Sequence, residues 1–340
     1  MRISMKEPYA FFPVCSFPLF DSLLRTRGEV KDLSYFYLGN TFEYVRKEKI
    51  QVVNGELNLS FGTTKKLHEE RYDEEKQSVR SYLADRLKDI YGVNIYYKSF
   101  KKYEDFKKYI KEQLGKGEPV ICQFNLMYTP TKVQYLKKYG VHTLMILGED
   151  SKSQVYDCME AGVNPYFLLK EEDLKKCFDL NITTYGTEKV YILKKENDIY
   201  IEKNELLKKS VEEICGNSYG QIEILEQFIE DITTYMREKV DKAKFTIPDL
   251  WSLSLERQTA IRWLDSYVDS VEEIQVVSKI KKIEEGLKKA ANLWVNIVFT
   301  FERNMYLKEW EYSDKLVQKL YAVKEQEISN YNLWKTLKEK

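Results

Sequence analysis

Three residues that lie far apart in the sequence, Cys15, His142 and Asp157, have the types that a nucleophilic triad requires. In such a triad an imidazole takes the proton of a thiol, and a carboxylate orients the imidazole. His142 begins the apolar segment 142–147, and Asp157 ends the segment 154–157. The Gly-Glu-Asp run that separates the two segments predicts a hairpin, which would bring the imidazole and the carboxylate together.

Cys15 lies where an extended Pro13-Val14 leads into an apolar helical pattern over 16–26. At the start of a helix, unpaired backbone N–H groups and the positive end of the dipole stabilise a thiolate, and so lower the pKa of a thiol. Pro18 fits this placement because proline is tolerated in a first turn. The same N–H groups, with Ser16, are candidates for an oxyanion hole. The alternative is that Cys15 is a small apolar core residue, as free cysteines generally are.

His142 and Asp157 each have a simpler interpretation. A histidine at the start of a buried strand is often a structural residue, and an aspartate at a strand end is commonly a turn former. Glu149 and Asp150 compete with Asp157 for the imidazole, but they fall in the predicted hairpin turn. His68 lies in a charged run, Lys-Lys-Leu-His-Glu-Glu, and has no comparable context. The residues occur in the order small residue, histidine, apolar strand, glycine, strand and acid. This order favours a catalytic role for His142 and Asp157 over a structural one.

Two of the five cysteines are rival nucleophiles. Cys122 lies within an apolar strand pattern, where it would be buried and distant from a helix terminus. Cys158 follows Asp157 directly, so on a strand its side chain would point to the opposite face. Both are predicted to be structural. The chain has no CxxC motif and only two histidines, so it offers no zinc ribbon, thioredoxin motif or His-rich metal site, and no cofactor is expected.

Composition limits the class of protein. The chain has 340 residues, 43% of them hydrophobic, which is enough for two domains with packed cores. Lys+Arg and Asp+Glu both number 54, and this neutral balance argues against a general nucleic-acid binder. The sequence has no apolar run long enough to span a membrane and no signal-peptide pattern at its start. We therefore expect a cytoplasmic protein that is not bound to a membrane.

Strand and helix patterns alternate in residues 1–197, whereas residues 198–340 have helical spacing alone. The expected strands are 94–98, 119–124, 142–147, 154–157 and 187–194, and the expected helices between them are 79–90, 103–114 and 171–177. Five helices are expected afterwards, at 206–214, 221–240, 250–270, 271–291 and 293–338. The main breakers in this part are the Cys-Gly-Asn-Ser-Tyr-Gly turn at 215–220, Pro248 and Gly286.

A further motif follows the strand predicted at 119–124. The strand with Gln123 continues into Asn125-Leu-Met-Tyr128-Thr-Pro130, and a leucine-marked segment, 169–174, follows the acid strand. Over residues 8–195 the order of motifs resembles papain-like cysteine enzymes. More narrowly, it resembles the butirosin-biosynthesis protein H family and its relatives near nonribosomal-peptide and polyketide clusters. The resemblance implies a papain-like α/β (α+β) domain with an antiparallel sheet at 1–197 and an all-α domain at 198–340.

The resemblance also implies an activity in secondary metabolite biosynthesis. An acyl group held as a thioester on an acyl carrier protein would pass to Cys15 and then to the amine of a small acceptor. His142 would act as base and then as acid, oriented by Asp157. Ser16, Gln123, Asn125 and Tyr128 are the side chains expected near the oxyanion or the substrate.

Two other functions remain open at this stage. The same fold would serve a cysteine peptidase that acts on a short peptide. A catalytically silent scaffold or binding module would instead use the aromatic-rich surface of a chain with 26 tyrosines. The oligomeric state is also open, with a homodimer among the alternatives.

Overall fold

The computed structural model describes residues 2–9, 15–30, 32–38, 52–53, 56–57, 71–132, 136, 140–162, 164–199, 201–237, 250–307 and 314–338. The chain divides into two compact units. The α/β unit comprises Met1–Leu33 and Glu69–Tyr200, and the helical unit comprises Ser34–His68 and Ile201–Lys340. The division near Tyr200 lies close to the predicted boundary after residue 197, but the segment Ser34–His68 belongs to the helical unit.

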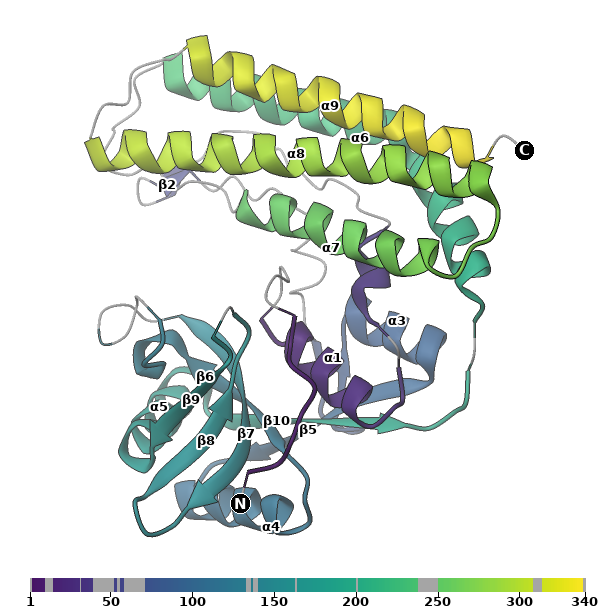
Figure 1. The fold of residues 1–340 in the computed structure, drawn as a ribbon. Coiled ribbons are helices and arrows are strands. Elements are labelled where there is room, and N and C mark those ends of the chain that lie inside the picture. Colours follow the sequence, from purple (N-terminus) through teal and green to yellow (C-terminus); the bar gives the residue numbers. More distant parts are fainter. Residues whose placement is uncertain are drawn as a thin grey trace. The chain divides into compact units, whose positions relative to one another are not determined.

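The α/β unit contains an eight-stranded antiparallel sheet in the order β3-β4-β5-β10-β6-β7-β8-β9. Figure 1 labels its strands β5–β10. Its strands are β3 (Arg71–Asp73), β4 (Ser78–Arg80), β5 (Val93–Phe100), β6 (Val120–Asn125), β7 (Val141–Asp150), β8 (Val155–Met159), β9 (Tyr166–Lys170) and β10 (Glu188–Lys195). A separate two-residue pair joins β1 (Val52–Val53) to β2 (Glu56–Leu57). An α/β class with an antiparallel sheet, followed by a helical C-terminal region, is therefore confirmed.

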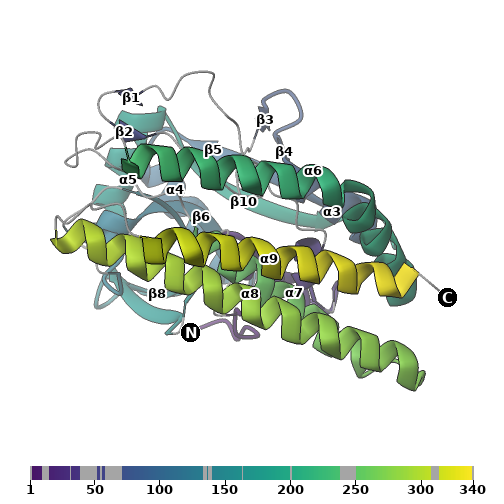
Figure 2. The same ribbon diagram turned by 90° about the horizontal axis from the view of Figure 1, so that it is seen from above.

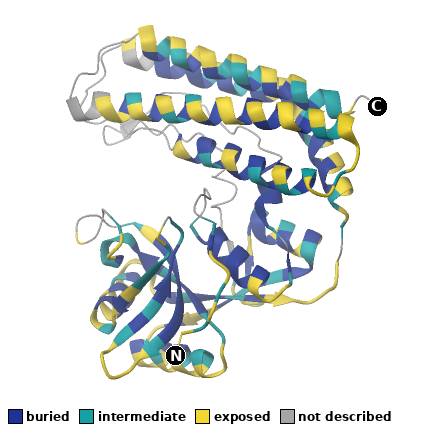
Figure 3. Cartoon of the chain, in the orientation of Figure 1, coloured by how far each residue is buried: buried dark blue, intermediate teal, exposed yellow. Residues whose placement is uncertain are grey.

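Four helices of the α/β unit accompany the sheet: α1 (Phe17–Thr26), α3 (Tyr82–Tyr91), α4 (Tyr103–Gly115) and α5 (Glu171–Tyr185). Apolar residues of α4 and α5 pack with one face of β6, β7 and β8, and β6 and β7 are buried over most of their length (Figure 3). Helix α3 begins later than predicted because the Ser81 side chain caps it by accepting from the Ala84 N–H at 3.1 Å. Val79 and Arg80 consequently belong to β4.

Helix α1 is fixed by a buried ion pair. The Asp21 carboxylate, which has no exposed surface, accepts a hydrogen bond from Arg25 Nε at 2.6 Å and from the Leu33 N–H at 3.0 Å. The Arg25 guanidinium also donates to the Glu7 carbonyl at 2.7 Å. Segments before and after α1 are thereby tied to one pair of side chains on the helix.

The helical unit contains the short 3-10 helix η1 (Ser34–Tyr37) and four long helices: α6 (Lys203–Arg237), α7 (Trp251–Val268), α8 (Ile274–Leu307) and α9 (Asp314–Lys338). Helix α9 packs against α6 and α8, and α8 also packs against α7 (Figure 2). The Tyr35 ring of η1 lies 5.6 Å from the Trp263 ring of α7, measured between centroids. Among the described helices, none is long and apolar enough to cross a membrane.

Three predicted breaks in this unit are wrong. Helix α6 runs through the expected turn at 215–220, and Gly216 and Gly220 lie on its exposed face with nothing within 4 Å of an added Cβ. Helix α8 runs through both Gly286 and the expected break after Ala291. At Gly286 a Cβ would lie only 2.3 Å from Asn330 Oδ1 of α9, so this glycine permits two helices to approach closely.

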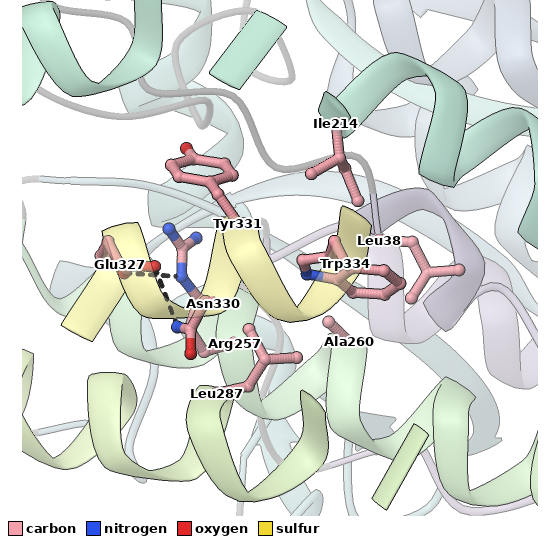
Figure 4. A pocket seen from close by; sticks show the side chains of 9 residues that line it. All are labelled: Leu38, Ile214, Arg257, Ala260, Leu287, Glu327, Asn330, Tyr331 and Trp334. Carbon is pink, nitrogen blue, oxygen red and sulfur yellow. Dashed lines mark hydrogen bonds and ion pairs between the residues drawn. The ribbon is translucent and has the colours of Figure 1, made fainter. Parts of the chain in front are cut away.

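Buried charges occupy the contact between α7 and α9. Glu327 Oε1 accepts from Arg257 Nε at 3.0 Å, and Glu327 Oε2 accepts from Asn330 Nδ2 at 3.2 Å (Figure 4). Glu327 Oε1 also accepts from Trp294 Nε1 at 3.0 Å. The adjoining cavity, which Tyr331 also lines, has a volume of about 20 Å³. That volume holds about one water molecule, so the cavity is too small for an organic ligand.

We expect Gly286→Ala to destabilise the protein by about 1–3 kcal/mol, because the new methyl group must displace Asn330 from its hydrogen bonds. Gly220→Ala is the matched control, and we expect it to stabilise α6 by about 0.5–1 kcal/mol through helix propensity alone. Urea unfolding of both variants measures the difference. Equal effects in the two variants would contradict the proposed close approach.

Glu188, at the start of β10, generates a second prediction. Burial raises the pKa of its carboxyl group to about 8, although Asn181 Nδ2 donates to Glu188 Oε2 at 2.7 Å. The unfolded chain ionises this group near pH 4.5 and the folded chain near pH 8, so wild-type stability falls between these values. We expect Glu188→Gln to exceed the wild type in stability by roughly 2–4 kcal/mol at pH 8.5 and to lose this advantage toward pH 5.

Calorimetry across this pH range tests the Glu188 prediction, with Glu172→Gln as the matched control. The pKa of the Glu172 carboxyl is lowered by its hydrogen bond to Lys176, so its removal has no such advantage at alkaline pH. A Glu188→Gln variant whose stability relative to wild type does not change with pH would show that Glu188 ionises normally in the fold.

Candidate active site

Cys15 lies directly before the start of α1. Ser16 is the N-cap residue, and its carbonyl accepts from the N–H groups of Leu19 and Phe20 at 3.2 and 3.1 Å. The helix thus begins at Phe17, one residue later than the sequence predicts, and Pro18 lies in its first turn as expected. The Cys15 side chain is half-buried. A thiol at this position lies at the positive end of the helix dipole.

The connection between β6 and β7 determines where the histidine lies. Asn125 Oδ1 accepts from the Met127 N–H at 3.0 Å and from the Gly140 N–H at 3.3 Å. The Leu126 N–H donates to the Gly140 carbonyl at 2.9 Å. Both ends of the connection are therefore joined through Asn125, and β7 begins immediately afterwards with His142 as its second residue.

The structure brings Cys15 and His142 together. The imidazole is 5% exposed, and its interaction with the Cys15 side chain raises the pKa of His142. Cys15 Sγ also lies 3.7 Å from the Thr143 hydroxyl oxygen. Because His142 Nε2 is engaged by a carboxylate at 2.8 Å, Nδ1 is the ring nitrogen left to exchange a proton with the thiol.

The carboxylate that contacts His142 belongs to Glu160, which follows β8 and is 2% exposed. Its other oxygen, Oε1, accepts a hydrogen bond from the Thr131 hydroxyl. Lys132 Nζ lies 3.1 Å from Oε2, the same oxygen that contacts the imidazole. Glu160 therefore has the position that the sequence assigned to Asp157.

Glu160 and His142 each favour the charged form of the other. Burial acts to raise the pKa of Glu160, but hydrogen bonds from His142 and Thr131 and the charge of Lys132 outweigh burial, and the pKa is lowered. Burial acts to lower the pKa of His142, but its hydrogen bonds to Cys15 and Glu160 outweigh burial, and the pKa is raised. The site consequently favours an ionised Glu160 beside a protonated imidazole, the arrangement that stabilises a neighbouring thiolate.

Asp157 does not reach His142, and the register of the hairpin explains the error. Asp157 pairs with Gly148, six residues beyond His142 on β7, which is roughly 20 Å along a strand. The turn lies at residues 151–154, after Asp150, whose carboxylate accepts from the Lys152 N–H at 3.0 Å. The Gly-Glu-Asp run at 148–150 is thus part of β7 and not the turn.

Glu160 reaches the imidazole through the same register. Continuing the pairing of Met145 with Met159 by one residue places Glu160 opposite Leu144. His142 is two residues from Leu144 and so faces the same side of the sheet, which makes Glu160 its diagonal neighbour. The sequence contained a signal for this arrangement, because the polar run Asp150-Ser-Lys-Ser-Gln154 is a stronger turn pattern than Gly-Glu-Asp.

The other predicted site residues have different surroundings. Gln123 pairs with Thr143 across β6 and β7, so it shares a sheet face with the hydroxyl near Cys15. Its Oε1 is buried and has no hydrogen-bond partner in the part of the chain that the structure describes. Asn125 organises the connection before β7, as described above. Tyr128 packs against the core beneath α4 and α5, and no contact recorded for the described residues joins it to Cys15 or His142.

The remaining cysteines lack the features of Cys15. Cys122, Cys158 and Cys177 are buried, and burial raises the pKa of each thiol well above its usual value. Cys215 is half-buried in α6, and burial raises its pKa as well. Among the described residues, no group of three or more histidine, cysteine and acidic side chains has an arrangement suited to a metal ion.

Comparisons with known proteins give no family for this chain. No protein-family model matches it, and no curated protein has a significantly similar sequence.

We expect Glu160→Gln to lower the pKa of His142 by about one unit, because the substitution removes the carboxylate that stabilises the imidazolium. Asp157→Asn should leave it unchanged, since Asp157 pairs with Gly148 far along the hairpin. Imidazole NMR titration measures this directly, as the chain has only two histidines and His142→Gln identifies the signal. A shift in the Asp157 variant without one in the Glu160 variant would contradict the geometry.

Proposed function

We propose that the chain is a cysteine-dependent acyltransferase in which Cys15, His142 and Glu160 form the catalytic triad. The observation that carries the proposal is one imidazole that interacts with the Cys15 thiol and contacts a buried carboxylate at 2.8 Å. Each member matches a role: a half-buried sulfur at a helix start, a base with a free ring nitrogen, and an acid that fixes the imidazole tautomer.

The proposed reaction has two steps. The Cys15 thiolate attacks the carbonyl carbon of an acyl thioester, the bond to the donor sulfur breaks, and the imidazolium of His142 protonates the departing thiolate. The amine of a small acceptor then attacks the acyl-cysteine, and His142 takes the proton that the amine loses. The amide leaves, and Cys15 returns as a thiolate beside a protonated imidazole. A thioester is already activated, so positioning and oxyanion stabilisation supply most of the catalysis.

Two groups are proposed to stabilise the oxyanion. The first is the positive N-terminal end of α1, next to which Cys15 lies. The amide of Gln123 lies opposite Thr143, whose hydroxyl contacts Cys15 Sγ, so this side chain is the proposed second donor. Ser16, which is 4% exposed, contributes through its backbone position and not through its hydroxyl group.

The fold and the substrate class are proposed on the resemblance of the sequence motifs. A cysteine at a helix start, facing a histidine on an antiparallel sheet, is the arrangement of papain-like enzymes, and we propose that the α/β unit has this fold. Within that class, the motif order is similar to the butirosin-biosynthesis protein H family. The proposed donor is accordingly an acyl thioester on a carrier protein, and the proposed acceptor is a small amine of secondary metabolism.

We expect an acyl-N-acetylcysteamine thioester to transfer one acyl group to Cys15, detected by intact mass and peptide mapping after acid quenching. Cys15→Ala should abolish the adduct, and His142→Ala should slow its formation by about 100-fold or more, because the general base is lost. Cys215→Ala is the matched control: it removes the other half-buried cysteine and should change nothing. Addition of a small amine should release the acyl group as an amide.

Iodoacetamide labelling at neutral pH provides the second readout. Selective modification of Cys15 that depends on His142 supports the triad. Equal labelling of several cysteines, or none at Cys15, would favour a scaffold without catalysis. A burst of product from a short peptide, with no adduct from the thioester, would instead indicate a cysteine peptidase.

A further inference from the structure

Lys132 extends the chain of charged groups beyond the triad. Its ammonium lies 3.1 Å from Glu160 Oε2 and donates to the Ala161 carbonyl, also at 3.1 Å. The side chain is 26% exposed, whereas that of Glu160 is 2% exposed. Lys132 therefore places a positive charge on the inner carboxylate oxygen from the solvent side, and its two contacts fix where that charge lies.

The carboxylate oxygen that binds Lys132 is also the one that binds the imidazole. Because Oε2 lies 2.8 Å from His142 Nε2 and 3.1 Å from Lys132 Nζ, the two nitrogens are at most about 6 Å apart. At this separation two charges interact appreciably even when water screens them partly. Thiolate, imidazolium, carboxylate and ammonium thus form a row of alternating charge.

We propose that Lys132 is a positioning residue for the triad, whose ammonium holds Glu160 ionised against His142 and so sets the pH range in which the Cys15 thiolate and the His142 imidazolium coexist. The proposal rests on the proposed function of Cys15. Thr131 complements Lys132 by donating its hydroxyl to the other carboxylate oxygen, which fixes the rotation of the carboxyl group without adding charge.

Few other titratable groups influence this row. Cys15 approaches His142 from the start of α1. Cys158, on β8, interacts electrostatically with Glu160 and with its neighbour Asp157, but burial raises the pKa of its thiol well above 9, so it is neutral in the working range. Among the described residues that act on Glu160, Lys132 is therefore the side chain that supplies positive charge besides the imidazole.

Electrostatics determines the direction in which the pH transitions of Cys15 and His142 move when a charge is removed. Loss of the Lys132 charge makes the site more negative, so the thiolate forms only at higher pH and the imidazolium persists to higher pH. Both transitions therefore move upward. Loss of the Glu160 charge makes the site more positive, and the imidazolium transition moves downward. A residue that only supports the local structure would lower reactivity at every pH without moving either transition.

The experiment follows two transitions in the full-length protein. The acid limb of the iodoacetamide rate at Cys15 reports thiolate formation, and imidazole NMR reports His142. We expect Lys132→Met and Lys132→Gln to move both transitions upward by about 0.5–1 pH unit, and Lys132→Arg to restore the wild-type values. Lys107→Met is the matched control, because it breaks a partly exposed ion pair with Glu171, whose N–H donates to the Gln154 carbonyl at the turn end of the hairpin.

The outcomes separate this proposal from the one on which it rests. A wild-type Cys15 that does not react selectively defeats the proposed function itself. A reactive Cys15 whose two transitions are unchanged in both uncharged Lys132 variants, with melting temperatures near that of the wild type, overturns the role of Lys132 alone. Two uncharged variants are used because glutamine keeps a hydrogen-bond donor that methionine lacks, which distinguishes loss of charge from loss of the contact.

Discussion

The arrangement of side chains around His142 in the α/β unit depends on one buried carboxylate, that of Glu160. Removing an ionised carboxyl group from water is costly unless hydrogen bonds and opposite charge replace the solvent. Glu160 has such replacements from His142, Thr131 and Lys132, which come from two different segments of the chain. Each segment must therefore hold its position for the carboxylate to stay ionised. The double hydrogen bond of Asn125 Oδ1, which joins the start and the end of the β6–β7 connection, supplies that restraint.

The register between β7 and β8 determines whether Glu160 lies on the same face of the sheet as His142. A shift of one residue between β7 and β8 would turn Glu160 to the face opposite His142 and expose the apolar residues that pack beneath α4 and α5. Burial of Leu144, Ile146 and Cys158 in that core thus selects the same register as the hydrogen bond to the imidazole. Because one pairing satisfies both, the contact between Glu160 and His142 gains stability from packing that lies outside the site.

Local patterns predicted the elements, whereas the pairing of distant residues was harder to predict. The start of α1 and the positions of β6 and β7 follow from proline placement and apolar runs, so Cys15 and His142 were identified as a pair. Glu160 does not follow from local patterns because its partner depends on where the hairpin turns, and the turn lies at the Asp-Ser-Lys-Ser run and not at the preceding glycine. Gly286 was misjudged for a related reason: its role depends on Asn330 of another helix, which periodicity cannot reveal.

The helical unit offers an internal comparison that favours the α/β unit as the site of chemistry. Arg257 and Glu327 also form a buried, hydrogen-bonded ion pair, but both side chains are about 3% exposed and border a cavity of about 20 Å³. No substrate fits there, so that pair serves packing between helices. In the α/β unit the row of charges instead ends at groups that solvent reaches, the half-buried Cys15 at one end and Lys132 at the other. Glu160 and His142 are buried, whereas Cys15 and Lys132 are partly exposed. A reagent can therefore reach the Cys15 sulfur while the Glu160 carboxylate stays shielded from solvent.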